Sequence, residues 1–171
     1  SDRDNFWQKL PQAGTIWFPD LRLLTNRITD RLFDGGRLYF PGTNTWGVSS
    51  LLVSNSAVTF ADSGFRLAVT NDIVIAANGV LGIGDDPAGS NYVLTCGGSL
   101  SLTDGSALYA YAGNTNGTDP DYGTLVQIGG TLSLQSNCWV QPIANEINGG
   151  TVFFRAGGIT VDANAGFNAN A

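Results

Sequence analysis

The sequence predicts an all-β fold built from a repeated unit, and three observations support this prediction. Helix-forming surface residues are scarce, because the 171 residues include one lysine (Lys9), one glutamate (Glu146) and no methionine. Glycine contributes 23 residues, and serine, threonine, valine and leucine fill much of the remainder, as is typical of strands separated by turns. Finally, short stretches of alternating apolar and polar residues recur in register along the chain.

Four segments carry the repeat, at residues 71–84, 97–110, 129–142 and 158–170. Each contains two apolar residues two positions apart, and successive pairs lie 27, 32 and 27 residues further along the chain: Ile73/Ile75, Leu100/Leu102, Leu132/Leu134 and Ile159/Val161. A period of two indicates strands with one apolar face. Weaker echoes of the pattern lie upstream, at residues 13–20, 35–42 and 57–64.

A residue that tolerates left-handed backbone follows each pair at the same distance, namely Asn78, Gly105, Asn137 and Asn164. After this bend the apolar alternation resumes, at Leu81/Ile83, Leu108/Ala110, Val140/Pro142 and Phe167/Ala169. A further short strand precedes the glycine-rich turn of each unit, at residues 67–69, 93–95, 125–128 and 152–154.

Three short strands per repeat predict one rung of a right-handed parallel β-helix, a solenoid whose rungs stack about 4.8 Å apart. The alternative is a β-sandwich of hairpins, which would place turn signals every ~8–12 residues without an in-register column.

The repeat divides the chain into two parts. Residues 1–46 match it poorly and are expected to form an N-terminal capping segment, while residues 47–171 form β-helix repeats that continue in a longer parent chain. A cap is needed because an open solenoid end exposes unpaired strand edges. Asp20 is suited to begin a helix that ends at Gly35 and carries apolar residues at helical spacing: Leu21, Leu24, Ile28 and Leu32.

Composition excludes several classes of function. The net charge is −6, so the chain lacks the basic surface that nucleic-acid binding requires. Without histidine it has no serine–histidine or cysteine–histidine nucleophile and no HExxH zinc site. No apolar run approaches the ~20 residues of a membrane-spanning helix. We therefore expect neither nucleic-acid binding nor membrane insertion.

The two cysteines, Cys96 and Cys138, are expected to remain free thiols. In the repeat register Cys96 is equivalent to Ile128 and Cys138 to Ser106, so they lie on different sheets of adjacent rungs. A disulfide would require Cα atoms within ~7 Å.

The sequence predicts no cofactor, and Ca²⁺ is the one alternative, because one loop carries oxygen ligands that suit it. These residues are Asn114, Asn116, Asp119 and Asp121, at nearly alternate positions. The match to a known calcium loop is partial, because no glutamate closes it. The alternative is a solvated loop whose side chains cap their own turns.

Acidic pairs such as Asp85 and Asp86, or Asp119 and Asp121, resemble the acid and base of glycoside hydrolysis. However, a lyase also needs a basic residue, and only Arg66 and Arg155 are present in the repeat region. We therefore expect the chain not to be an enzyme.

The register also predicts outward-facing aromatic residues on two adjacent rungs, Tyr109, Tyr111 and Trp139. Flat rings on a rigid sheet suit stacking on glycans or contact with a protein partner. The alternative is that they stack on each other and cover the sheet.

The repeats at residues 97–113 (GGSLSLTDGSALYAYAG), 129–158 (GGTLSLQSNCWVQPIANEINGGTVFFRAGG) and 159–171 (ITVDANAGFNANA) resemble the right-handed β-helix stalks of secreted bacterial surface proteins, such as autotransporter passenger domains and adhesin-like repeat proteins. The resemblance implies an extracellular or cell-surface location. It also implies a non-catalytic structural or adhesive function, in which a rigid β-helix self-associates or contacts neighbouring domains or glycans multivalently.

Two other functions stay open, because many unrelated activities use this fold. One is a carbohydrate-binding or polysaccharide-cleaving β-helix module. The other is a segment of a virion fibre or tailspike.

Overall fold

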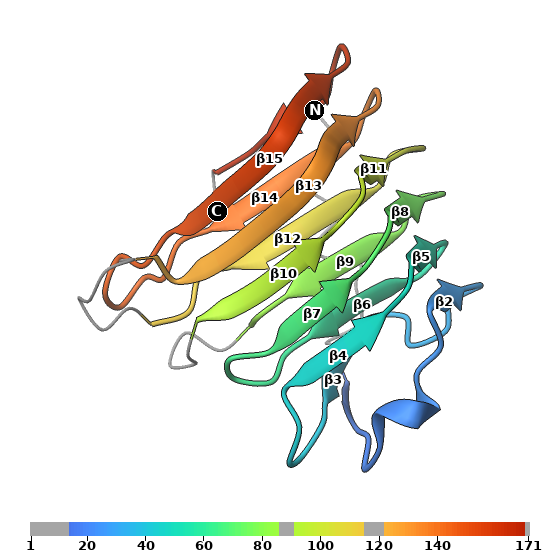
Figure 1. Ribbon diagram of the computed structural model, residues 1–171, viewed down its shortest axis with the longest axis vertical. Coiled ribbons are helices and arrows are strands. Elements are labelled where there is room, and N and C mark those ends of the chain that lie inside the picture. The colour runs from blue at the N-terminus through green and yellow to red at the C-terminus, as the bar shows by residue number, and fades with distance from the viewer. Residues whose placement is uncertain (1–13, 86–90, 115–121, 170–171) are drawn as a thin grey trace.

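The computed structural model describes residues 14–85, 91–114 and 122–169, which form two sheets of stacked strands enclosing an apolar core (Figure 1). Every strand pair given by the described residues is parallel. A sandwich of hairpins would require antiparallel pairs. The all-β prediction is confirmed, and the parallel two-sheet arrangement is consistent with a β-solenoid.

The seven-stranded sheet has the order β1–β3–β6–β9–β12–β14–β16. Its strands are β1 (Thr15–Trp17), β3 (Gly36–Tyr39), β6 (Ala57–Phe60), β9 (Val80–Ile83), β12 (Ala107–Tyr111), β14 (Trp139–Ile143) and β16 (Gly166–Phe167).

The nine-stranded sheet has the order β2–β5–β8–β11–β13–β10–β7–β4, and β15 pairs with β13. Its strands are β2 (Arg27–Thr29), β4 (Thr45–Val48), β5 (Leu51–Ser54), β7 (Arg66–Val69), β8 (Ile73–Ala76), β10 (Tyr92–Cys96), β11 (Leu100–Leu102), β13 (Thr124–Leu134) and β15 (Val152–Val161). The long strand β13 pairs with both β10 and β11, and this joins the two arms of the sheet.

The predicted register is confirmed in each of the four repeat segments. Ile73 neighbours Leu100, Leu100 neighbours Leu132, and Leu132 neighbours Ile159 on adjacent strands. The predicted bend residues all have left-handed backbone, with φ of 59° at Asn78, 73° at Gly105, 64° at Asn137 and 58° at Asn164. The same bend therefore recurs on every rung that the pattern identified.

The prediction placed a turn at each glycine pair, and the chain does bend at Gly97 and Gly98, between β10 and β11. At the equivalent Gly129 and Gly130 the strand β13 continues, but its register with β15 shifts between Ile128 and Thr131. A Cβ atom on Gly129 would lie 2.4 Å from the carbonyl oxygen of Gly97, and one on Gly157 would lie 2.6 Å from that of Gly129. Glycine is therefore needed here because the backbones of stacked rungs approach closely, and the chain does not reverse.

The prediction of a helix between Asp20 and Gly35 was wrong. Asp20 does cap a helix, accepting a hydrogen bond from the backbone N–H of Arg22, but this helix is the short 3₁₀ turn η2 (Leu21–Leu23). Ile28, expected on the same helix, lies in β2 and is completely buried. Pairing of β2 with β5 and burial of Ile28 outweigh the local helical spacing.

The N-terminal strands belong to the same two sheets as the repeats. β1 and β3 extend the seven-stranded sheet, whereas β2 and β4 extend the nine-stranded one. Phe18, Leu21, Leu24 and Phe33 pack against the core. The described part of residues 1–46 thus adds strands to the stack and also covers its end.

Within the described residues, no helix has the length and apolar character needed to cross a bilayer.

Candidate functional site

Tyr109 and Tyr111 lie on the outer face of the seven-stranded sheet. Along β12 they alternate with the buried residues Leu108 and Ala110. Their rings stack with centroids 6.2 Å apart and planes inclined by 23°. Both side chains are half-buried, and burial raises the pKa of each phenol above its ordinary value. The pair therefore presents protonated, neutral rings at physiological pH.

Trp139 occupies the same face on the neighbouring strand β14 and is half-buried. The register pairs Trp139 with Ala107 and Tyr109 with Gln141. Trp139 is therefore diagonal to Tyr109 across the strand pair, at a distance that long aromatic side chains span. The three residues share one face, as the alternation predicted.

A charged pair lies on this face beside Tyr111. Arg37, on β3, forms an ion pair with Asp85, which follows β9. The side chain of Asp85 is only 14% exposed, and its hydrogen bond raises the pKa of Arg37. The charges of Arg37 and Asp85 also act on the Tyr111 phenol, which places it close to the pair. The sequence pattern missed this pair, because β3 belongs to one of the weaker upstream echoes, whereas β9 belongs to the regular repeat.

Gly84 directs the chain to Asp85. Its φ of 77° is left-handed, and a Cβ atom there would lie 2.6 Å from the ring of Tyr92. No other residue type fits this position without strain.

A cavity of about 490 Å³ opens next to Tyr111. Asp85, Asn145 and Glu146 contribute polar atoms to its wall, and Ala112 and Ile143 contribute apolar ones. The Asn145 carbonyl side-chain oxygen accepts hydrogen bonds from the backbone N–H groups of Ile147 (2.9 Å) and Asn148 (3.2 Å). This wall is therefore a fixed turn, and the Glu146 side chain that it carries is exposed.

Most of the expected calcium ligands lie outside the described residues, which include Asn114 but not Asn116, Asp119 or Asp121. Asn114 is exposed. In the part of the chain that the structure describes, no three Asp, Glu, His or Cys residues gather in a way that would hold a metal ion.

Of the acidic pairs considered for acid–base chemistry, the only member described is Asp85, because Asp86, Asp119 and Asp121 lie outside the described ranges. Asp85 is engaged by Arg37, and a different carboxylate, Glu146, shares its cavity.

Cys96 and Cys138 are free thiols, as predicted, and both are buried. Cys96 is paired in register with Ile128, and the Cys138 Sγ lies 3.8 Å from the Ser106 Oγ. Burial raises the pKa of the Cys96 thiol, which makes it a poor nucleophile.

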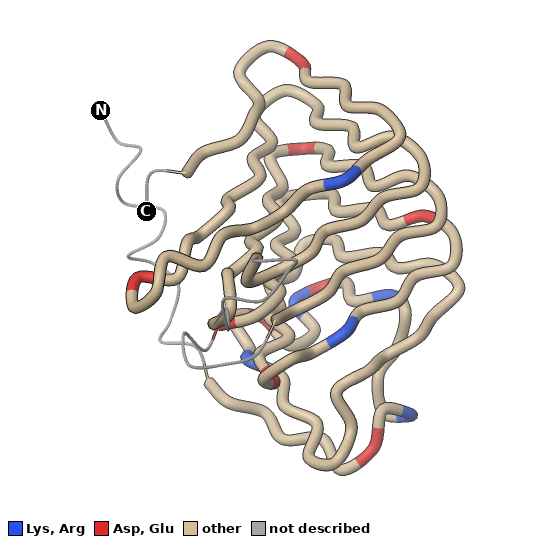
Figure 2. The backbone as a smooth tube through the Cα atoms, turned by 60° about the vertical axis from the view of Figure 1, so that its left-hand side comes forward, with Lys and Arg blue, Asp and Glu red and all other residues tan. Residues whose placement is uncertain are grey.

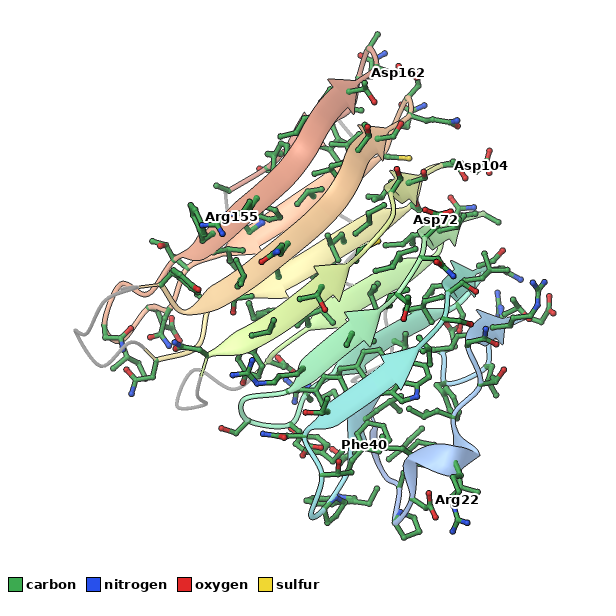
Figure 3. The ribbon with its side chains drawn as sticks, viewed as in Figure 1. Arg22, Phe40, Asp72, Asp104, Arg155 and Asp162 are labelled. Atoms are coloured by element: carbon green, nitrogen blue, oxygen red, sulfur yellow. The ribbon has the colours of Figure 1, made fainter. Side chains whose placement is uncertain are left out.

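The last rung of the stack forms a second candidate surface. We use the term open end for the outer edges of β15 and β16 with the core-facing side chains Ile159, Val161 and Phe167. Their exposed fractions are 54%, 47% and 42%, whereas their counterparts on the preceding strands are 0% (Leu132), 1% (Leu134) and 0% (Val140) exposed. Figure 3 shows Arg155 and Asp162 on this last rung, with Phe40 and Arg22 at the opposite end of the stack.

Comparison of the chain with protein-family models, with curated proteins and with solved structures gave no match.

Proposed function

We propose that the chain is a non-catalytic structural module, a right-handed parallel β-helix that associates with a second copy of itself through its open end. The observation that carries the proposal is the exposure of Ile159 and Val161, in a column that is buried on every preceding rung from Ile73 onward. Right-handed winding is proposed because parallel crossovers are right-handed in nearly all proteins.

The backbone of the open end supports this proposal. β15 has ten residues, and it pairs with β13 along one edge. Proteins usually protect such an edge with proline, lysine, an inward-pointing charge or a short strand. β15 contains no proline or lysine, and its one charged residue, Arg155, lies in the outward-facing register beside Gln127. This edge is thus suited to accept another strand.

Low charge at the open end favours a second copy as the partner. Among residues 152–169 the charged side chains are Arg155 and Asp162, which carry opposite signs. Figure 2 shows how sparse charged residues are along the stacked strands. Two such surfaces do not repel each other, and both present apolar residues that gain from burial. A second copy also carries the same rung spacing and register.

The chemistry of the chain supports a non-catalytic role. The sequence has no histidine, and Asp85, one of the two carboxylates that line the cavity beside Tyr111, is ion-paired with Arg37. The resemblance of the repeats to stalks of secreted bacterial surface proteins supports an extracellular or cell-surface location and an adhesin-like role. There, a repeated rigid surface would bind by many weak contacts.

The test is solution mass by light scattering coupled to size exclusion, measured over a wide concentration range. We expect the wild-type chain to form dimers or larger assemblies as concentration rises. The double variant Ile159→Lys/Val161→Lys should stay monomeric, because two lysines at the edge oppose burial and pairing. The matched control is Leu23→Lys, an equally exposed apolar residue (58%) at the other end, which should associate like the wild type. A wild-type chain that stays monomeric, or a double variant that associates normally, would refute the proposal.

A further inference from the structure

We propose that the cavity beside Tyr111 is a binding site for one neutral sugar residue of a glycan. The cavity lies where β9, β12 and β14 end, and its described polar residues lie outside β15 and β16, although Ala169, which follows β16, also lines it. Binding in this cavity is therefore tested separately from self-association. Its volume of about 490 Å³ falls within the ~300–1,000 Å³ range of small-molecule sites.

The carboxylates that line the cavity are hydrogen-bond acceptors, so a ligand must supply donors. Asp85 and Glu146 are carboxylates, and ionised carboxylates only accept hydrogen bonds. The hydroxyl groups of a sugar supply such donors, and hydrogen bonds to charged acceptors are about twice as strong as neutral ones.

The apolar part of the cavity suits the other face of a sugar ring. Ala112 and Ile143 line it together with the Tyr111 ring. The face of an aromatic ring is electron-rich, so it attracts the weakly positive C–H groups of a pyranose. Tyr109, stacked on Tyr111, continues this aromatic surface along the sheet. One side of the site is therefore apolar and the other accepts hydrogen bonds.

The net charge of the residues that line the cavity favours a neutral ligand over an anionic or cationic one. The negative charge of Asp85 is balanced by Arg37, so Glu146 leaves the site with one net negative charge. An acidic sugar would be repelled by Glu146. A cation would find a single exposed carboxylate, whereas sites that hold quaternary ammonium groups enclose them with several aromatic faces. A neutral sugar uses both carboxylates without carrying charge of its own.

The site is held in shape before any ligand binds. The ion pair to Arg37 fixes Asp85, and the hydrogen bonds within the 144–150 turn fix the position of Glu146 along the backbone. The Asn145 amide also donates to the carbonyl oxygen of Ala112 at 3.4 Å, which ties the turn to the strand beside Tyr111. Pre-formed groups reduce the entropy that binding loses.

The test is saturation-transfer NMR and titration calorimetry of the wild-type chain with four probes. Two are neutral, methyl glucoside and methyl N-acetylglucosaminide; one is anionic, methyl galacturonide; and one is cationic, choline. We expect saturable binding of at least one neutral glycoside and none of the galacturonide. Binding of choline alone, or of no probe, would overturn the inference.

Two variants locate the site. Glu146→Gln removes the uncompensated charge from an exposed side chain and should weaken binding of the neutral glycoside about tenfold. Ala144→Trp should fill the cavity, which Ala144 lines, and abolish binding. Its matched control is Ala163→Trp, at another exposed alanine in a turn away from the cavity, which should bind normally. Unchanged affinity in both cavity variants would overturn the inference, and their unchanged solution mass would separate this result from any failure of self-association.

Discussion

The two ends of the stack are built from the same kind of rung but differ in how they are covered. At the N-terminal end, Phe18 stacks on Phe40 with ring centroids 5.6 Å apart, and η2 and the following turn pack against the core. Leu38 and Ile28, close to this end, are completely buried. At the open end, Phe154 meets Phe167 edge to face at 5.3 Å, but Ile159 and Val161 stay about half exposed.

This difference shows that the position of a side chain in the repeat does not by itself determine how far the side chain is buried. Ile159 and Val161 have the same place in the repeat as Ile73 and Ile75, which are 0% exposed. Their environment differs because a rung is buried only when another element lies on each side of it. A covered end gives stability, whereas an uncovered end leaves core-facing apolar side chains exposed.

The largest effect should come from removing an aromatic ring near the covered end. Phe60 is completely buried, and its ring stacks on Phe65 at 4.9 Å and lies 5.4 Å from that of Trp46. Phe60→Ala should lower the free energy of unfolding by about 3–5 kcal/mol in urea denaturation.

Phe167→Ala is the matched variant at the open end. It should cost about 1 kcal/mol or less, because 42% of the Phe167 side chain is already exposed. Equal losses in the two variants would contradict the difference between the ends.

A smaller effect should follow from adding one carbon atom where rungs meet. Gly129→Ala places a Cβ atom 2.4 Å from the backbone oxygen of Gly97, which cannot move without disturbing β10. We expect a loss of about 1–3 kcal/mol in the free energy of unfolding. Gly158→Ala on the last rung meets only the Thr131 side chain, at 3.4 Å, and should change stability by less than about 0.5 kcal/mol. A large loss in Gly158→Ala would show that the last rung is packed as tightly as the interior ones.

The smallest expected change in the free energy of unfolding comes from the carboxyl group of Asp62, near the covered end, and this change depends on pH. Partial burial raises the pKa of Asp62, although its hydrogen bond from the Phe40 backbone N–H opposes the rise. A carboxyl whose pKa is higher in the folded state binds its proton more tightly there. Its contribution therefore favours folding at low pH and is lost as the pH rises from the unfolded-state pKa through the folded-state value.

Asp62→Asn keeps an oxygen that accepts the Phe40 N–H but carries no charge. Compared with the wild type, the variant should gain stability at neutral pH, and the gain should shrink below about pH 4. Urea denaturation at several pH values measures it. A gain that does not change with pH would contradict the role of the charge.

The sequence predicted the repeating part of the fold well because two local signals coincide there. Alternation identifies Leu100 and Leu132 as inward-facing, and Asn78 and Asn137 mark bends that demand left-handed backbone. The N-terminal part was predicted poorly because Ile28 satisfies both a helical spacing and a strand. Only its pairing with Val53 on β5 decides between them, and that partner is distant in sequence.

The candidate site was predicted in part. Alternation along β12 placed Tyr109 and Tyr111 on the outer face, because that inference needs only local spacing. Arg37 and Glu146 were missed as neighbours of this face. Arg37 reaches Asp85 across β6, and Glu146 arrives through a turn closed by Asn145 hydrogen bonds. Neither relation leaves a periodic signal in the sequence.

The strictly parallel register also affects how the stack forms and how its ends open. Each rung is a template for its neighbours, so folding that begins at any tightly packed rung, such as the one with the Phe40–Phe60–Phe65 cluster, can propagate along the stack. Among the described residues β15 and β16 are paired on one side only, with β13 and β14, and strands with fewer buried contacts open at a lower free energy than interior ones. The edge of β15 can accept another strand only while β15 itself is paired with β13. The local stability of this last pair of strands, and not that of the interior, therefore sets how often the edge is available.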